Sequence, residues 1–134
     1  MSVQPNNIYE NMLRKEVDEV SGDIYDNIKN LDRYPIENAK KVLEILIQSA
    51  CIGQNCAPIE LARRKIGEIN HQWIIEHFIE TADACINYLD EWEYRRLVEL
   101  TVYCVPELKS IVLEKGRFSE NAEVREVVDD YSDF

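Results

Sequence analysis

Apolar residues recur every three or four positions along nearly the whole of this 134-residue chain, and strict alternation is almost absent. This spacing places side chains on one face of an α-helix. Only four glycines and four prolines interrupt the pattern, which is too few for a turn-rich all-β fold. The sequence therefore predicts an all-α protein with six to seven helices. The first apolar stripe consists of Leu13, Val17, Val20, Ile24, Ile28 and Leu31.

Capping residues, prolines and glycines predict where the helices begin and end. We expect one long N-terminal helix over about residues 8–31, because its apolar stripe keeps its phase across Ser21-Gly22, and two helices broken at this pair are the alternative. Helical pairs are expected over about 35–116 and a C-terminal helix over about 119–131, all within a single domain of residues 1–134. Asn70 and Asp90 have the side chains of N-caps. The prolines that precede expected helices are Pro35, Pro58 and Pro106.

Two segments that begin 55 residues apart are similar to each other, Lys40–Ile47 and Arg95–Val102, and each precedes a helix that a proline begins. Antiparallel helix pairs stacked as in an α-solenoid would give such an internal repeat, and an irregular helical bundle is the alternative. With the segment Ala62–Ile69, the pattern over residues 35–116 resembles HEAT or armadillo-type repeats. The resemblance implies stacked helix pairs.

The charge of the chain limits its partners. Acidic residues number 26 and basic residues 15, so the formal net charge is −11. Such a chain repels phosphate backbones and anionic membranes and attracts cationic partners. In size, charge and helical architecture it is similar to the helical immunity proteins that neutralise bacterial toxins. That resemblance implies a protein inhibitor and assigns no residues.

The compartment is predicted from what the sequence lacks. No stretch reaches the roughly 18 apolar residues that a membrane span needs, and the first residues do not form a secretory signal. We therefore expect a cytoplasmic protein with no membrane partner. Its four cysteines are then expected to be reduced thiols, namely Cys51, Cys56, Cys85 and Cys104.

Motifs for catalysis, metals and cofactors are not found. Cys51 and Cys56 lack a second pair of ligands at zinc-site spacing, and the Glu68-x-x-His71 half of a di-iron motif has no second copy. No serine or cysteine stands in a nucleophile turn, and no glycine-rich phosphate loop exists. We expect no metal, no cofactor and no enzyme activity. An enzyme with paired carboxylates in a cleft is a third possibility, after two binding functions.

The first of these functions is binding of a basic protein. Two consecutive predicted helices carry aromatic and acidic residues on faces turned away from the expected core. Rings supply rigid contact area, and carboxylates attract and bind lysine or arginine. An immunity or antitoxin-type inhibitor would cover a basic toxin domain, such as a nuclease, with this surface. Its alternative is that Trp73 and Tyr103 form a second layer of core. The predicted partner-binding residues are Trp73, Glu76, His77, Glu80, Asp83, Tyr88, Trp92, Glu99 and Tyr103.

The second function is binding of nucleic acid or a phosphorylated peptide by a helical scaffold or regulatory module. Basic residues occur at comparable places in successive helices, and in a solenoid they would form a cationic strip. The alternative is that they form ion pairs with neighbouring acids. The residues of the strip are Lys40, Lys41, Arg63, Arg64, Lys65, Arg95 and Arg96. The sequence leaves the oligomeric state open.

Overall fold

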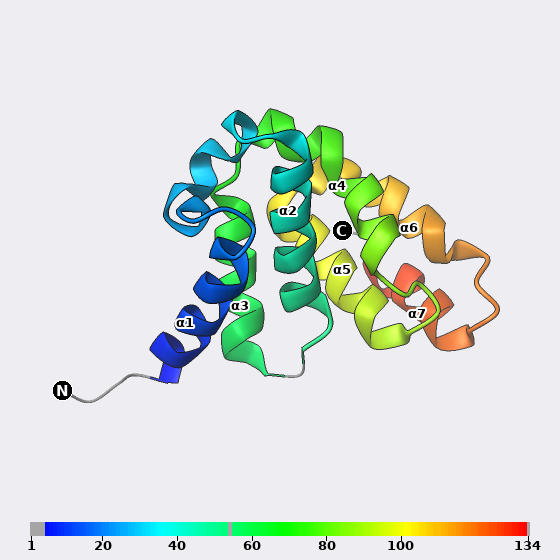
Figure 1. The fold of residues 1–134 in the computed structure, drawn as a ribbon. Coiled ribbons are helices and arrows are strands. Elements are labelled where there is room, and N and C mark those ends of the chain that lie inside the picture. The colour runs from blue at the N-terminus through cyan, green and yellow to red at the C-terminus, as the bar shows by residue number, and fades with distance from the viewer. Residues whose placement is uncertain (1–4, 54, 134) are drawn as a thin grey trace.

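The structure is a computed structural model that describes residues 5–53 and 55–133. Within these ranges the chain forms α-helices and short 3-10 segments and no strand, so the all-α prediction is confirmed (Figure 1). None of these helices has the length and apolar character that a membrane crossing requires. The elements are α1 (Pro5–Asp18), the 3-10 segment η1 (Ile24–Arg33), α2 (Ile36–Cys51), α3 (Cys56–Gly67), α4 (His71–Cys85), α5 (Glu91–Cys104), the 3-10 segment η2 (Pro106–Leu108), α6 (Lys109–Arg117) and α7 (Ala122–Tyr131).

Helix α2 lies at the centre of the fold and packs against α3, α4 and α5 (Figure 1). Helices α2 and α3 run antiparallel, with α1 packed against α3 at one end of the molecule. At the other end, α6 and α7 pack against each other and against α5. Consecutive helices α4 and α5 share few contacts, because each packs on α2 instead. The outward faces of α4 and α5 therefore do not form one continuous surface.

The expected long helix over residues 8–31 is wrong. Helix α1 ends at Asp18, and the chain resumes as η1, in which Asn27 and Asn30 have non-helical backbone angles. Ser21 and Gly22, which lie between α1 and η1, are poor helix formers, since a glycine inside a helix costs about 1 kcal/mol relative to alanine. The Asp18 carboxylate accepts a hydrogen bond from the Tyr25 amide at 3.0 Å and so fixes the start of η1. The apolar stripe is still buried.

The capping predictions hold, and two helix starts are displaced, because α3 begins at Cys56 and contains Pro58 in its first turn. The side chain of Asn70 accepts a hydrogen bond from the Trp73 amide, and Asp90 accepts bonds from two amides of α5. The C-terminal helix begins at Ala122 rather than near residue 119, because the cap is Asn121, whose side chain accepts from the Glu123 amide.

The core is mostly aliphatic, with a few large aromatic rings between the helices. The ring of Tyr94 is fully buried, and its hydroxyl donates to the carbonyls of Val112 and Leu113 at 2.8 and 3.2 Å. Gly116 of α6 lies directly against this ring. The absence of a side chain at Gly116 therefore sets how closely α6 approaches α5.

Candidate protein-binding surface

The aromatic residues predicted to lie on the outer face of α4 are largely covered. Trp73 is only 9% exposed, and its ring packs on His77 with 4.6 Å between centroids. Tyr88 is half-buried, and its hydroxyl donates to the Asp83 carboxylate at 2.6 Å. The prediction that Trp73 is a binding residue is therefore wrong, and the alternative, a second layer of core, describes it. On the same helix, Ile74 is buried next to Trp73, while Ile75 is only partly covered.

The acidic stripe of α4 is exposed, and most of it is neutralised within the molecule. Glu80 forms an ion pair with Lys40 of α2, and Asp83 forms one with Lys115 of α6 at 3.1 Å. Glu76 accepts a hydrogen bond from a neighbouring glutamine. Carboxylates that already hold a cation contribute less to attraction of a basic partner, so α4 loses much of its predicted role.

The outer face of α5 keeps two free rings. Trp92 is 63% exposed and Tyr103 is 61% exposed, as an outward face requires. Between them lies Glu99, which accepts hydrogen bonds from Arg63 at 2.6 Å and from Arg96 at 3.2 Å. Burial alone would raise the pKa of Glu99, but the hydrogen bond from Arg63 and the two guanidinium charges outweigh it and lower the pKa.

Glu99 therefore joins elements rather than facing a partner. Its other oxygen accepts a hydrogen bond from Tyr131 of α7 at 3.3 Å, so one carboxylate holds α3, α5 and α7 together. The sequence placed Glu99 on the outer face correctly by helical phase. Arg63 and Tyr131, which cover Glu99, lie more than 30 residues away from it in the sequence, so helical phase could not reveal them.

The predicted cationic strip does not form as a row of free charges. Lys41 and Arg64 are exposed and form no ion pair with any described residue. The remaining five basic residues are paired: Lys40 with Glu80, Arg63 and Arg96 with Glu99, Lys65 with Glu68, and Arg95 with Glu91 and Asp130. The alternative interpretation, in which these residues neutralise neighbouring acids, describes the structure better.

Carboxylates that form no ion pair with described residues lie elsewhere, on α1 and α2. Glu16 and Glu19 of α1 and Glu44 of α2 line one shallow groove, together with the partly exposed Ile45 and one cation, Lys41. The thiol of Cys85 has its pKa raised to about 12, mainly by burial and further by the charges of Glu44 and Glu93.

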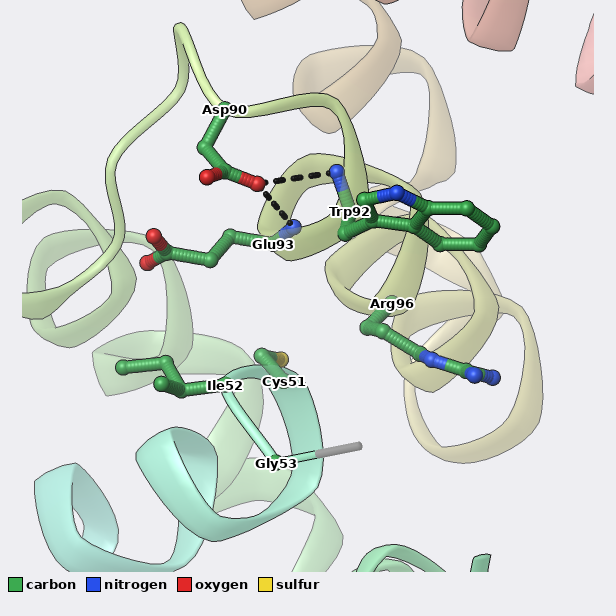
Figure 2. A pocket seen from close by; sticks show the side chains of 7 residues that line it. All are labelled: Cys51, Ile52, Gly53, Asp90, Trp92, Glu93 and Arg96. Atoms are coloured by element: carbon green, nitrogen blue, oxygen red, sulfur yellow. Dashed lines mark hydrogen bonds between the residues drawn. The ribbon is translucent and has the colours of Figure 1, made fainter. Parts of the chain in front are cut away.

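A cleft of about 430 Å³ lies between the end of α2 and the start of α5 (Figure 2). The carboxylates of Asp90 and Glu93 lie on one side of it and Ile52 on the opposite side, with the Trp92 ring at the edge. Ile52 is 48% exposed, so it and Trp92 offer apolar area beside the two acids. The full lining is Cys51, Ile52, Gly53, Asp90, Trp92, Glu93 and Arg96.

Both carboxylates in the cleft have an oxygen to spare. One oxygen of Asp90 accepts from the amides of Trp92 and Glu93 at 2.9 and 3.0 Å, which leaves its second oxygen without a bond to described residues. One oxygen of Glu93 accepts from the Asn87 amide at 3.2 Å, and its second oxygen is equally free. We call Glu16, Glu19, Glu44, Asp90 and Glu93 the acidic surface.

The acidic surface was missed by sequence reasoning, apart from the capping role of Asp90. With 26 acidic residues in the chain, nothing local distinguishes these five from those that the fold pairs with lysine or arginine. Ile52 was missed as well, since it was expected only to end a helix. What sets these residues apart is their place on the groove and the cleft, which is a property of the tertiary structure.

The histidines and cysteines of the described ranges bear on catalytic and metal chemistry. No group of three or more His, Cys, Asp or Glu side chains there is arranged to hold a metal ion. His71 contacts Glu107 at 2.5 Å, while His77 packs on Trp73, so the two histidines act apart. Burial raises the pKa of the Cys51 thiol in the cleft well above its ordinary value, so this thiol is not an activated nucleophile.

Comparison with known proteins finds no family model that matches the chain, and no match among curated sequences or solved structures. The proposals that follow therefore rest on the surface just described.

Proposed function

We propose that this chain is a protein-binding module that binds a basic protein on the acidic surface and on the cleft beside Trp92. The specific form we favour is a cytoplasmic immunity or antitoxin-type inhibitor, which covers a basic toxin domain such as a nuclease. The observation that carries the proposal is the neighbourhood of unpaired carboxylates with exposed Trp92 and Ile52 across α2 and α5.

The electrostatics support a cationic partner. The chain carries a net charge of −11, and the acidic surface contributes five carboxylates whose charge no basic residue neutralises within ion-pair distance. Opposite charge accelerates the encounter of two proteins and orients them before contact. Salt screens this attraction, with a Debye length of about 8 Å at physiological ionic strength.

Exposed apolar groups support protein binding over simple ion binding. Tryptophan is enriched among the few residues that dominate binding energy in interfaces, and its neighbours usually exclude water around it. Trp92 and Ile52 line the same cleft as the two acids, so apolar contact area and negative charge are offered together. Tyr103, further along the same face of α5, extends the contact area.

Capture followed by reconstitution tests the proposal. The native chain is used to capture a protein from its own cells, and the captured protein is then purified and bound to three forms of the chain. These are the native form, a cleft variant (E44Q, D90N and E93Q) and a charge-matched control (E120Q, E123Q and E126Q). The control residues are exposed, lie near the start of α7 and form no ion pair with described residues.

We expect a partner with net positive charge that binds native and control chains alike and binds the cleft variant at least tenfold more weakly. Its association rate constant is expected to fall as salt rises from about 50 to about 300 mM, because the attraction is screened. A partner that binds all three forms equally contradicts the proposed surface. A nucleic acid bound through Arg64 and Lys41, with no protein partner, contradicts the proposed function.

A further inference from the structure

We infer that the cleft between α2 and α5 receives an arginine side chain of the partner. This inference rests on the proposed function and adds the chemical group that the cleft recognises. Its basis is the joint placement of two free carboxylate oxygens, the end of a long helix and an exposed indole ring around one cavity.

The end of α2 makes the cleft more negative. A helix exposes unpaired carbonyl groups in its last turn and carries a partial negative charge there. Helix α2 has 16 residues and no basic residue in its last turn, and Cys51 and Gly53 at its end line the cleft. The amide of Ile52 donates to the carbonyl of Gln48 and so closes the last turn of α2 beside the cleft.

Two features of the cleft oppose a cation, and each is offset only in part, since Arg96 shares the one Glu99 carboxylate with Arg63. The positive end of α5 points towards the cleft, but the Asp90 carboxylate accepts from its first free amides. The Arg96 guanidinium also lines the cleft, but it donates to Glu99 at 3.2 Å. Asp90, Glu93 and the end of α2 therefore leave a net attraction for a positive charge.

The shape of the donor and acceptor set favours arginine over lysine. A guanidinium is planar, donates in several fixed directions and stacks on aromatic rings, whereas an ammonium is a compact, strongly hydrated charge. The Trp92 ring lies at the edge of the cleft, on the side away from the Glu93 carboxylate, and is exposed enough to be stacked upon. Ile52 on the opposite side can contact the methylene groups of the same side chain.

The test uses the full chain and small probes, so it does not depend on the partner. N-acetyl-arginine amide is titrated into the protein at constant ionic strength while the indole N–H signals are followed by NMR. N-acetyl-lysine amide and the neutral isostere N-acetyl-citrulline amide are titrated in parallel. The chain has two tryptophans, and buried Trp73 serves as an internal reference for Trp92.

We expect the arginine probe to shift the Trp92 signal in a saturable manner, with Kd on the order of 10 mM. The lysine probe is expected to bind at least threefold more weakly, and citrulline is expected to leave Trp92 unshifted. In a D90N/E93Q variant the arginine shift is expected to weaken at least fivefold. An asparagine at position 90 still caps α5 through its carbonyl oxygen, so this variant keeps the fold. The E123Q/E126Q variant is the control and is expected to behave as the native chain.

Equal shifts from arginine and lysine, or from arginine in native and D90N/E93Q chains, overturn the inference. So does an unshifted Trp92 at the highest arginine concentration. If such a result is found while a basic partner still distinguishes the cleft variant from its control, the proposed function survives and the arginine assignment alone is wrong. If no basic partner binds yet arginine shifts Trp92, the cleft binds guanidinium and the proposed function fails.

Discussion

Replacement of Gly116 by alanine tests how closely α5 and α6 pack. At most helix positions, replacing glycine by alanine raises the stability of the helix by up to about 1 kcal/mol. Here a β-carbon at position 116 would lie 2.6 Å from three atoms of the Tyr94 side chain, namely two ring carbons and the hydroxyl oxygen. Carbon atoms in contact are normally about 3.5 to 4.0 Å apart, so either the ring or the helix must move.

The ring cannot withdraw at low cost. Tyr94 is fully buried, and its hydroxyl donates to two carbonyls of α6. Overpacking of a core costs about 1 to 3 kcal/mol, and weakening a hydrogen bond adds about 1 kcal/mol. After the favourable propensity term is subtracted, we expect G116A to lower the free energy of unfolding by about 2 kcal/mol.

Urea unfolding followed by far-UV circular dichroism measures this change. The matched control is G67A at the end of α3, where an added β-carbon would have no neighbour within 4 Å, and where we expect no loss of stability. A second measurement places G116A in a Y94L background, in which the contact is absent. The packing argument is refuted if G116A is as stable as G67A, or if its cost is the same with and without the Tyr94 ring.

Three further predictions follow from other contacts. The N121A variant should lose more stability than the roughly 1 kcal/mol that removal of an N-cap usually costs, because the Asn121 side-chain amide also donates to the Leu89 carbonyl at 3.0 Å. Thermal unfolding of N121A and of the simple cap variant N70A checks this difference. The E99Q variant should lose about 2 kcal/mol at pH 7, since Arg63 loses a charged acceptor. Because the pKa of folded Glu99 lies below its ordinary value, its contribution is present above about pH 4.5 and is lost as the pH falls through the lowered pKa, so native and E99Q curves should converge in acid. Finally, Cys56 should be the thiol that reacts fast with iodoacetamide in the folded protein, because it is exposed while burial raises the pKa of the other three thiols. Intact mass and peptide mapping identify the labelled cysteine. Fast labelling of a second thiol would contradict its burial in the structure.

Local signals in the sequence determined the helical class, most helix boundaries and the caps. Helical spacing and the side chains of Asn70 and Asp90 act over three or four residues, so their effect can be read without knowing the rest of the fold. The same local signal failed at residues 18–24. There the continued phase of the apolar stripe suggested one helix, while the structure has a break at the weak Ser-Gly pair, where the Tyr25 amide donates a hydrogen bond to the Asp18 carboxylate.

Only the tertiary structure decided which rings and charges are free. Trp73 and Trp92 both lie outside the expected apolar stripes, yet neighbouring elements cover one and leave the other open. Glu99 and Glu93 lie six residues apart on one helix, but Arg63, 36 residues from Glu99, reaches only the first. Burial and charge pairing depend on segments that are distant in sequence, and for that physical reason the acidic surface could not be located before the helices were packed together.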